Sequence, residues 1–342
     1  NGIMYNSAYF IQNGEVVDGV HKNILSDYDV FNESRYFIAG EDNSTIRYKN
    51  QNIRIIFDEY ESEFIDKNDS FVVMMGMTPF TIESRADRHH ILSTLAQKYS
   101  KNIIAVNHFG GYTSVLFDGN CTAYNYKGKL VAQLKEFDED FQIIDTNKLG
   151  SLPTIPFHQK EKIALIHEAL CFGIKDYFGK HGFKKAILGL SGGIDSAVVA
   201  ALAAEALGAD NVMGLLMPSR YSTDHSISDA EALAQNLQIP YATIAIKDIY
   251  DQYLNALQPL FKDQPFNVAE ENLQTRTRGM LVMAMSNKYG YIALNTSNKS
   301  EASVGYGTLY GDLCGSLGSL GDVYKTEVYE LANYINRERE II

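Results

Sequence analysis

The sequence predicts an α/β protein in two parts: a layered α+β half, followed by a doubly wound parallel sheet of the Rossmann-like kind. Three observations predict this class. Hairpin and βαβ patterns mix before residue 146, and chain-breaking residues follow at 150–156. From residue 186 onward, strand-like and helix-like segments alternate, as they do in parallel sheets.

In the first half, apolar segments on both sides of Asn13-Gly14 predict a hairpin with a two-residue turn. Helical spacing predicts a helix over Ala86–Tyr99. Further strands are expected at Ile53–Phe57, Phe71–Met75, Asn102–Asn107, Ser114–Phe117, Thr122–Tyr126, Leu130–Gln133 and Phe141–Asp145. This mixture indicates a layered sandwich over residues 1–149.

Residues 150–157 contain Gly150, Pro153 and Pro156, a composition typical of a linker. The second domain is therefore predicted over residues 158–342, beginning with a helix over His158–Phe178. Strands are expected at Ala186–Leu190, Val212–Met217, Tyr241–Ile246 and Tyr291–Asn295, and helices at Ser196–Leu207, Ser226–Leu237, Ile249–Leu260 and Ala269–Tyr289. The closing residues 336–342 contain no helix stop signal, so we expect the domain to continue beyond them.

Composition narrows the class of protein. A formal net charge of −12 argues against a nucleic-acid partner. No apolar run is long enough to cross a membrane, and no signal peptide is visible. Three cysteines lie far apart without a C-x-x-C pair, which argues against disulfides and cysteine-rich metal sites. We therefore expect a cytoplasmic protein.

A small-residue turn, Ser191–Ser196, connects the strand Ala186–Leu190 to the following helix. Glycines in such a turn let an anion approach backbone N–H groups at the positive end of the helix dipole. Ser191 and Ser196 add hydroxyl donors. The turn lacks the G-x-x-x-x-G-K-[ST] pattern of the P-loop. We interpret it as a phosphate-binding loop; the alternative is a tight turn without a ligand.

Three loops follow carboxyl ends of the predicted strands and should converge on one cleft: Ser191–Ser196, Pro218–His225 and Thr296–Glu301. Asp195 and Glu301 are candidate Mg²⁺ ligands there, since magnesium binds few protein carboxylates together with phosphate oxygens. Asp312 could join them or contact substrate. For Glu301 and Asp312 the alternative is a solvated or helix-capping carboxylate. Arg276 and Arg278, two apart on a helix, cannot both face the cleft.

The run Ser191-Gly-Gly-Ile-Asp195-Ser196 resembles the pyrophosphate loop of the ATP pyrophosphatase superfamily, which cleaves ATP between its α- and β-phosphates. That resemblance implies ATP as co-substrate and assigns its pyrophosphate to Ser191, Gly192, Gly193, Ile194, Asp195 and Ser196. Related GMP and asparagine synthetases keep this loop but act on other acceptors. A non-catalytic module that binds adenine nucleotides is the alternative outside the enzymes.

The first half resembles nitrilase-type amidases in His21–Tyr28, Val30–Phe37, Thr78–Phe80 and Val106–Gly111. In that family a Glu–Lys–Cys triad hydrolyses amides through a cysteine thiolate. The resemblance assigns the lysine to Lys22 and a glutamine-pocket tyrosine to Tyr28. The position of the cysteine, after Arg54-Ile-Ile56, holds Phe57. A phenyl ring is no nucleophile, so a solvated surface position is the alternative for Lys22.

The second half resembles NAD synthetases, and the amidase-like half before it is the layout of their glutamine-dependent branch. The segments that carry this resemblance are Gly214–Ser226, Glu271–Gly279, Thr296–Glu301, Gly305–Asp312 and Gly321–Thr326. It implies ATP-dependent amidation of nicotinic acid adenine dinucleotide through an acyl-adenylate, with ammonia from glutamine or free ammonium.

The same resemblance implies roles for single residues. Asp195 and Lys325 are expected in catalysis, with Mg²⁺ on Asp195 and Glu301. Thr296 is expected to contact nucleotide. Substrate contacts are expected from Arg276, Arg278, Lys299 and Asp312. Synthetases of this type are commonly assemblies, so we also expect a homo-oligomer.

Overall fold

The protein is described here from a computed structural model that covers residues 2–41, 45–262 and 264–342. The chain forms two compact units that divide between Lys160 and Glu161. The segment 150–157 belongs to the first unit. Within it, the Ile155 amide donates to the Leu130 carbonyl at 2.8 Å, and Phe157 stacks on His89 with ring centroids 4.1 Å apart.

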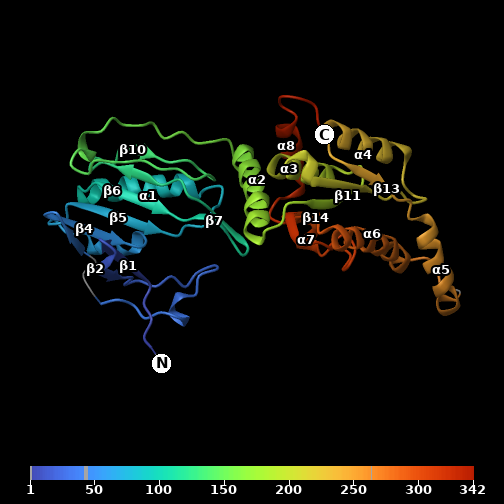
Figure 1. Cartoon of the computed structure of the whole chain (residues 1–342), viewed down its shortest axis with the longest axis horizontal. Helices are drawn as coiled ribbons and strands as arrows, with labels where there is room; N and C mark the ends of the chain where they lie inside the picture. Colours follow the sequence, from blue (N-terminus) through green and yellow to red (C-terminus); the bar gives the residue numbers. More distant parts are fainter. Residues whose placement is uncertain (1, 42–44, 263) are drawn as a thin grey trace. The chain divides into compact units, whose positions relative to one another are not determined.

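A mixed six-stranded sheet forms the centre of the first unit (Figure 1). Its strands, in spatial order, are β10 (Leu130–Gln133), β9 (Thr122–Tyr124), β6 (Ile103–Asn107), β5 (Phe71–Gly76), β4 (Gln51–Ile56) and β3 (Thr45–Tyr48). The three central strands β4, β5 and β6 run parallel, and their outer neighbours pair antiparallel. Helix α1 (Ser84–Tyr99) packs its buried Leu92 and Ala96 against Val72 and Ile103.

The predicted hairpin is formed by β1 (Ser7–Gln12) and β2 (Glu15–His21). Its turn has positive φ at both central residues, 54° at Asn13 and 84° at Gly14, as a type I′ turn requires. Ala8 and Val20 pack against the buried Phe57. A second hairpin joins β7 (Phe109–Tyr112) to β8 (Val115–Asp118).

The strand predicted at Phe141–Asp145 is wrong: these five residues, all described, form an irregular segment. Phe141 and Ile143 alternate as strand residues do, but both are more than 80% exposed, at 83% and 84%. A period of two indicates a strand only where one face is buried, and here neither side chain meets a core.

The second unit contains a five-stranded sheet in which every neighbouring pair is parallel. In spatial order its strands are β13 (Tyr241–Thr243), β12 (Val212–Leu216), β11 (Ala186–Leu190), β14 (Ile292–Asn298) and β15 (Leu317–Leu320). The order reverses between β11 and β14, the switch point at which open α/β sheets bind ligands. The strand β15 was not expected from the sequence.

Helices cover both faces of this sheet, which confirms the doubly wound prediction (Figure 1). They are α2 (Lys162–His181), α3 (Ile194–Leu207), α4 (Asp224–Leu237), α5 (Lys247–Phe261), α6 (Val268–Tyr289), α7 (Lys299–Val304) and α8 (Lys325–Ile335). On one face Val282 of α6 packs against Ile187 and Leu215. Across the described residues, no helix has the length and apolar content that crossing a bilayer demands.

Candidate active site

The predicted phosphate loop joins β11 to α3 at the switch point. Gly192 has a φ of +76°, and a Cβ on it would lie 2.3 Å from the Ser226 carbonyl oxygen at the start of α4. Only glycine fits this combination of backbone angle and close approach. Helix α3 begins at Ile194, two residues earlier than predicted. The first turn of a helix leaves its amides without intrahelical acceptors. Within the loop, the Gly193 amide donates to Ser191 Oγ at 3.2 Å.

The two serines of the loop have different surroundings. Ser196 is 3% exposed, and its hydroxyl donates to the Gly193 carbonyl at 2.9 Å. The exposed Ser191 places its Oγ 3.1 Å from the Ser196 Oγ. Ser196 therefore holds the loop in shape, and Ser191 is the hydroxyl that an anion can reach.

Asp195, in the first turn of α3, joins residues far away in the sequence. Its Oδ2 forms an ion pair with Lys325 Nζ at the start of α8. Its Oδ1 accepts a hydrogen bond from Asn298 Nδ2 at 3.0 Å. Asn298 is only 1% exposed and ends β14. Sequence reasoning missed Asn298, although Asn298-x-x-Glu301 is a capping-box pattern.

Glu301 caps its own helix, the alternative that the sequence left open. Its Oε2 accepts from the Asn298 amide at 3.1 Å, while its amide donates to Asn298 Oδ1 at 3.0 Å. Asn298 therefore contacts both carboxylates that were predicted to bind metal. Lys299 Nζ lies 3.8 Å from Asp322 Oδ1 and over the Tyr324 ring.

A cavity of about 310 Å³ lies beside the loop, between strand ends of the sheet and the helices α4 and α6. Its walls include the predicted residues Ser191, Arg278, Thr296 and Asp312. Arg278 donates from Nε to the Met217 carbonyl at 3.2 Å, and burial lowers the pKa of its guanidinium. Asp312 Oδ1 accepts from the Thr308 amide at 2.7 Å.

Several predicted residues do not line this cavity: Gly192, Gly193, Ile194, Asp195, Ser196, Arg276, Lys299, Glu301 and Lys325. Arg276 turns away from Arg278, as their spacing predicted, and its Nε donates to the Leu309 carbonyl at 3.1 Å. The structure thus separates a cavity with mixed polar and apolar walls from a charged group around Asp195, and Ser191 of the phosphate loop lines the cavity.

In the first unit, Lys22 is buried at 6% exposure, so the surface position considered from the sequence is wrong. Its Nζ lies 2.8 Å from Glu33 Oε2 and 3.5 Å from Asp58 Oδ2, and donates to Ser26 Oγ. Burial by itself would raise the pKa of Glu33. Hydrogen bonds from Lys22, the Ser26 amide and Asn6 outweigh that effect and hold this pKa below its usual value.

Phe57, at the position of the family cysteine, packs in an apolar cluster with Val20, Ile46 and Ile55. Its amide donates to Oε2 of the fully buried Glu61 at 2.8 Å. Oε1 of Glu61 accepts from the amides of residues 23 and 24, so this carboxylate ties the segment after Lys22 to the segment after β4. Sequence reasoning missed Glu61. Tyr28 is half exposed, with its ring edge-on to Phe31.

The chain is similar to known proteins along nearly its whole length. The model of the NAD synthase family matches residues 166–342. A glutamine-dependent NAD(+) synthetase from Synechocystis sp. is 42% identical over 99% of this chain and 64% of its own length. A glutamine-dependent NAD+ synthetase from Acinetobacter baumannii, solved in complex with ADP, is 35% identical with a TM-score of 0.93 over 99% of this chain and 68% of its own.

A second curated relative, from Aquifex aeolicus, is 35% identical over 97% of this chain. The chain spans 64% and 66% of the lengths of these two curated relatives. The segment that matches the family model contains the phosphate loop, Asp195, Asn298 and Lys325. On the motifs, the geometry and these similarities together, the chain belongs to the NAD synthase family.

Proposed function

We propose that this protein amidates nicotinic acid adenine dinucleotide to NAD, using ATP and releasing AMP and pyrophosphate. One observation carries the proposal: the phosphate loop holds Asp195, paired with Lys325, next to a cavity of about 310 Å³. The relatives' names specify NAD synthesis and so support NAD as the product.

Activation of the acceptor is the chemical problem that such a site solves. A carboxylate is a poor acyl donor, so it attacks the α-phosphate of ATP and becomes an acyl-adenylate while pyrophosphate leaves. Ammonia then displaces AMP. Amides of Gly192, Ile194 and Asp195 bind the departing pyrophosphate, where negative charge develops. Lys325 supplies a positive charge at the same point, and Thr296 contacts the nucleotide from the cavity wall.

The carboxylates near the loop fit the Mg²⁺ that this chemistry uses. The Asn298 side chain donates to Asp195 and its backbone amide donates to Glu301, and both carboxylates offer the hard oxygen donors that magnesium prefers. Asp195 and Glu301 would hold the ion, and a bound magnesium would supply positive charge that offsets the charge of the phosphates. Asn298 keeps both carboxylates in place.

Arg278 and Asp312 are the substrate contacts that the cavity supports best, because both line it. The guanidinium of Arg278 is held in place by the Met217 carbonyl and retains further donors for an acidic substrate group. Lys299 is proposed to neutralise phosphate charge. Arg276 faces the segment around Leu309 instead, so we assign it no direct contact.

Free ammonium is the proposed nitrogen source for this chain. Lys22, the position of the family lysine, forms ion pairs with Glu33 and Asp58, but residue 57 carries a phenyl ring that cannot attack glutamine. We expect ammonium to support NAD formation and glutamine to add nothing beyond its contaminating ammonia. Parallel assays of NAD formation with each nitrogen source check this, and a clear glutamine-dependent rate would contradict it.

A Phe57→Leu variant tests the same point by mutation. Leucine is smaller than phenylalanine and leaves a small cavity in the cluster with Val20 and Ile55, although a smaller one than alanine would leave. We therefore expect the free energy of unfolding of the first unit to fall by about 1–2 kcal/mol. The ammonium-driven rate should remain within about twofold of the wild-type rate, because Phe57 supplies no reacting group. Chemical denaturation and steady-state NAD assays measure the two effects.

Product identity tests the proposed reaction. With ATP, nicotinic acid adenine dinucleotide and ammonium, we expect one AMP and one pyrophosphate for each NAD formed. Accumulation of ADP and phosphate would contradict the adenylate mechanism. Nucleotide binding without turnover would favour the non-catalytic module.

We further propose that the protein is cytoplasmic and forms a homo-oligomer. Sedimentation velocity measures its assembly state.

A further inference from the structure

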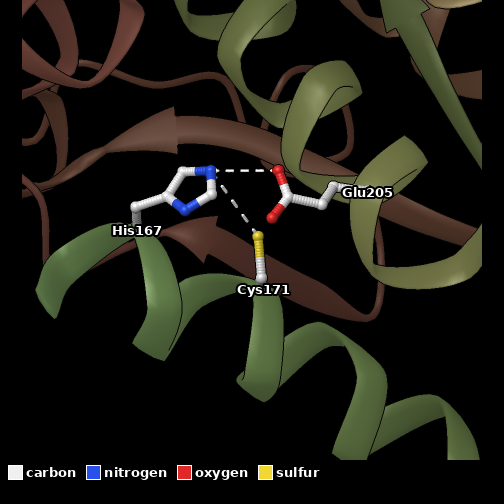
Figure 2. Close-up of side chains that lie close together, drawn as sticks. All are labelled: His167, Cys171 and Glu205. Carbon is white, nitrogen blue, oxygen red and sulfur yellow. Dashed lines mark hydrogen bonds and ion pairs between the residues drawn. The ribbon is translucent and has the colours of Figure 1, made fainter. Parts of the chain in front are cut away.

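A histidine, a cysteine and a glutamate meet between α2 and α3, away from the site described above (Figure 2). His167 and Cys171 are four residues apart on α2 and therefore share one face of that helix. Glu205 reaches them from α3. His167 Nε2 lies 3.2 Å from Glu205 Oε2 and 3.9 Å from Cys171 Sγ. The three side chains thus direct one N, one S and one O donor at a common point.

We propose that His167, Cys171 and Glu205 bind a zinc ion that ties α2 to α3. Imidazole, thiolate and carboxylate together are a donor set typical of zinc. In a tetrahedral site, Zn–N and Zn–S bonds of about 2.0 and 2.3 Å place nitrogen and sulfur about 3.5 Å apart. The observed separation of 3.9 Å needs little adjustment. Water occupies the fourth position.

The donor chemistry of the cluster suits a cation. His167 Nε2 and Glu205 Oε2 lie 3.2 Å apart, so an imidazole nitrogen and a carboxylate oxygen already face one another. Cys171 Sγ lies within 4.8 Å of both donor atoms. A zinc ion would supply the positive charge that stabilises a thiolate next to a carboxylate. The Cys171 thiolate and the Glu205 carboxylate together would balance the charge of the ion.

The position of the cluster indicates a structural ion. Glu205 lies ten residues after Asp195 on α3, about 15 Å along the helix. The cluster therefore lies outside the phosphate loop. His167 also contacts the Tyr334 ring of α8, with centroids 5.1 Å apart. Glu205 is 60% exposed and provides the route by which an ion enters.

Metal binding by the untagged protein tests the proposal directly. After removal of metals with a chelator, we expect the protein to bind one equivalent of Zn²⁺ in equilibrium dialysis. With Co²⁺ in its place, we expect the near-ultraviolet charge-transfer band of a thiolate ligand. Zinc should raise the melting temperature by several degrees, because it binds only the folded arrangement of α2 and α3.

Three variants and one control identify the ligands. Cys171→Ser should lose the charge-transfer band, and His167→Gln should bind zinc at least about tenfold more weakly. Glu205→Gln alters a mostly exposed side chain, so it keeps the fold and should also weaken binding about tenfold. The matched control Cys121→Ser, in the first unit, should bind like the wild type. Wild-type protein without stoichiometric zinc, or a band that persists in Cys171→Ser, would overturn the proposal.

Discussion

Replacing Asp195 with alanine is expected to lower the rate of NAD formation by about 10²–10³-fold. The carboxylate is the common partner of Lys325 and Asn298, which come from α8 and β14. Its loss removes a proposed magnesium ligand and leaves the amide of the 1% exposed Asn298 without that acceptor. Pyrophosphate release with ammonium and nicotinic acid adenine dinucleotide measures the effect on adenylation.

Two further variants make this experiment specific. Asp195→Asn keeps the shape and one acceptor for Asn298 but loses the charge, so it should fold like the wild type and be nearly as inactive as alanine. Asp210→Ala alters an exposed carboxylate after the same helix and should leave the rate unchanged. An Asp195→Asn enzyme with wild-type activity would refute the role of the charge.

Replacing Gly192 with alanine is expected to abolish tight ATP binding, with a loss of at least about 100-fold in affinity. The new methyl group would lie 2.3 Å from the Ser226 carbonyl oxygen and 2.8 Å from its Cα, and backbone atoms cannot rotate away. The positive φ of 76° adds strain. The loop must therefore shift away from α4, which misdirects its amides and costs about 2 kcal/mol of stability.

Isothermal titration with ATP and chemical denaturation measure the two losses separately. Gly179→Ala is the matched control, because a Cβ there meets nothing within 4 Å and the residue lies inside α2. Alanine in a helix interior should raise stability by about 0.5–1 kcal/mol and leave ATP affinity unchanged. Full ATP affinity in Gly192→Ala would mean that the anion binds elsewhere.

Much of the second unit could be predicted because its signals are local. Ala186–Leu190 is a strand as expected, since a short apolar run between polar segments suits the centre of a parallel sheet. Some element boundaries differ from the prediction. Strand β14 continues to Asn298 instead of ending at Asn295, because its last residues pair with β15. Strand β15 was not predicted from the sequence. Strand pairing depends on the partner, and no partner is visible in a local window.

The sequence by itself determined the glycine turn at Ser191–Ser196, the Asn13-Gly14 hairpin and the absence of a thiol at Phe57, because backbone preference and side-chain chemistry are properties of a short segment. Only the tertiary structure decided which distant side chains meet. Asp195 and Lys325 are 130 residues apart, and Glu205 lies on a different helix from His167 and Cys171. The order of the parallel strands and the packing of the helices bring such groups together. Both depend on the burial of apolar faces, so the polar side chains that meet do not themselves specify their meeting.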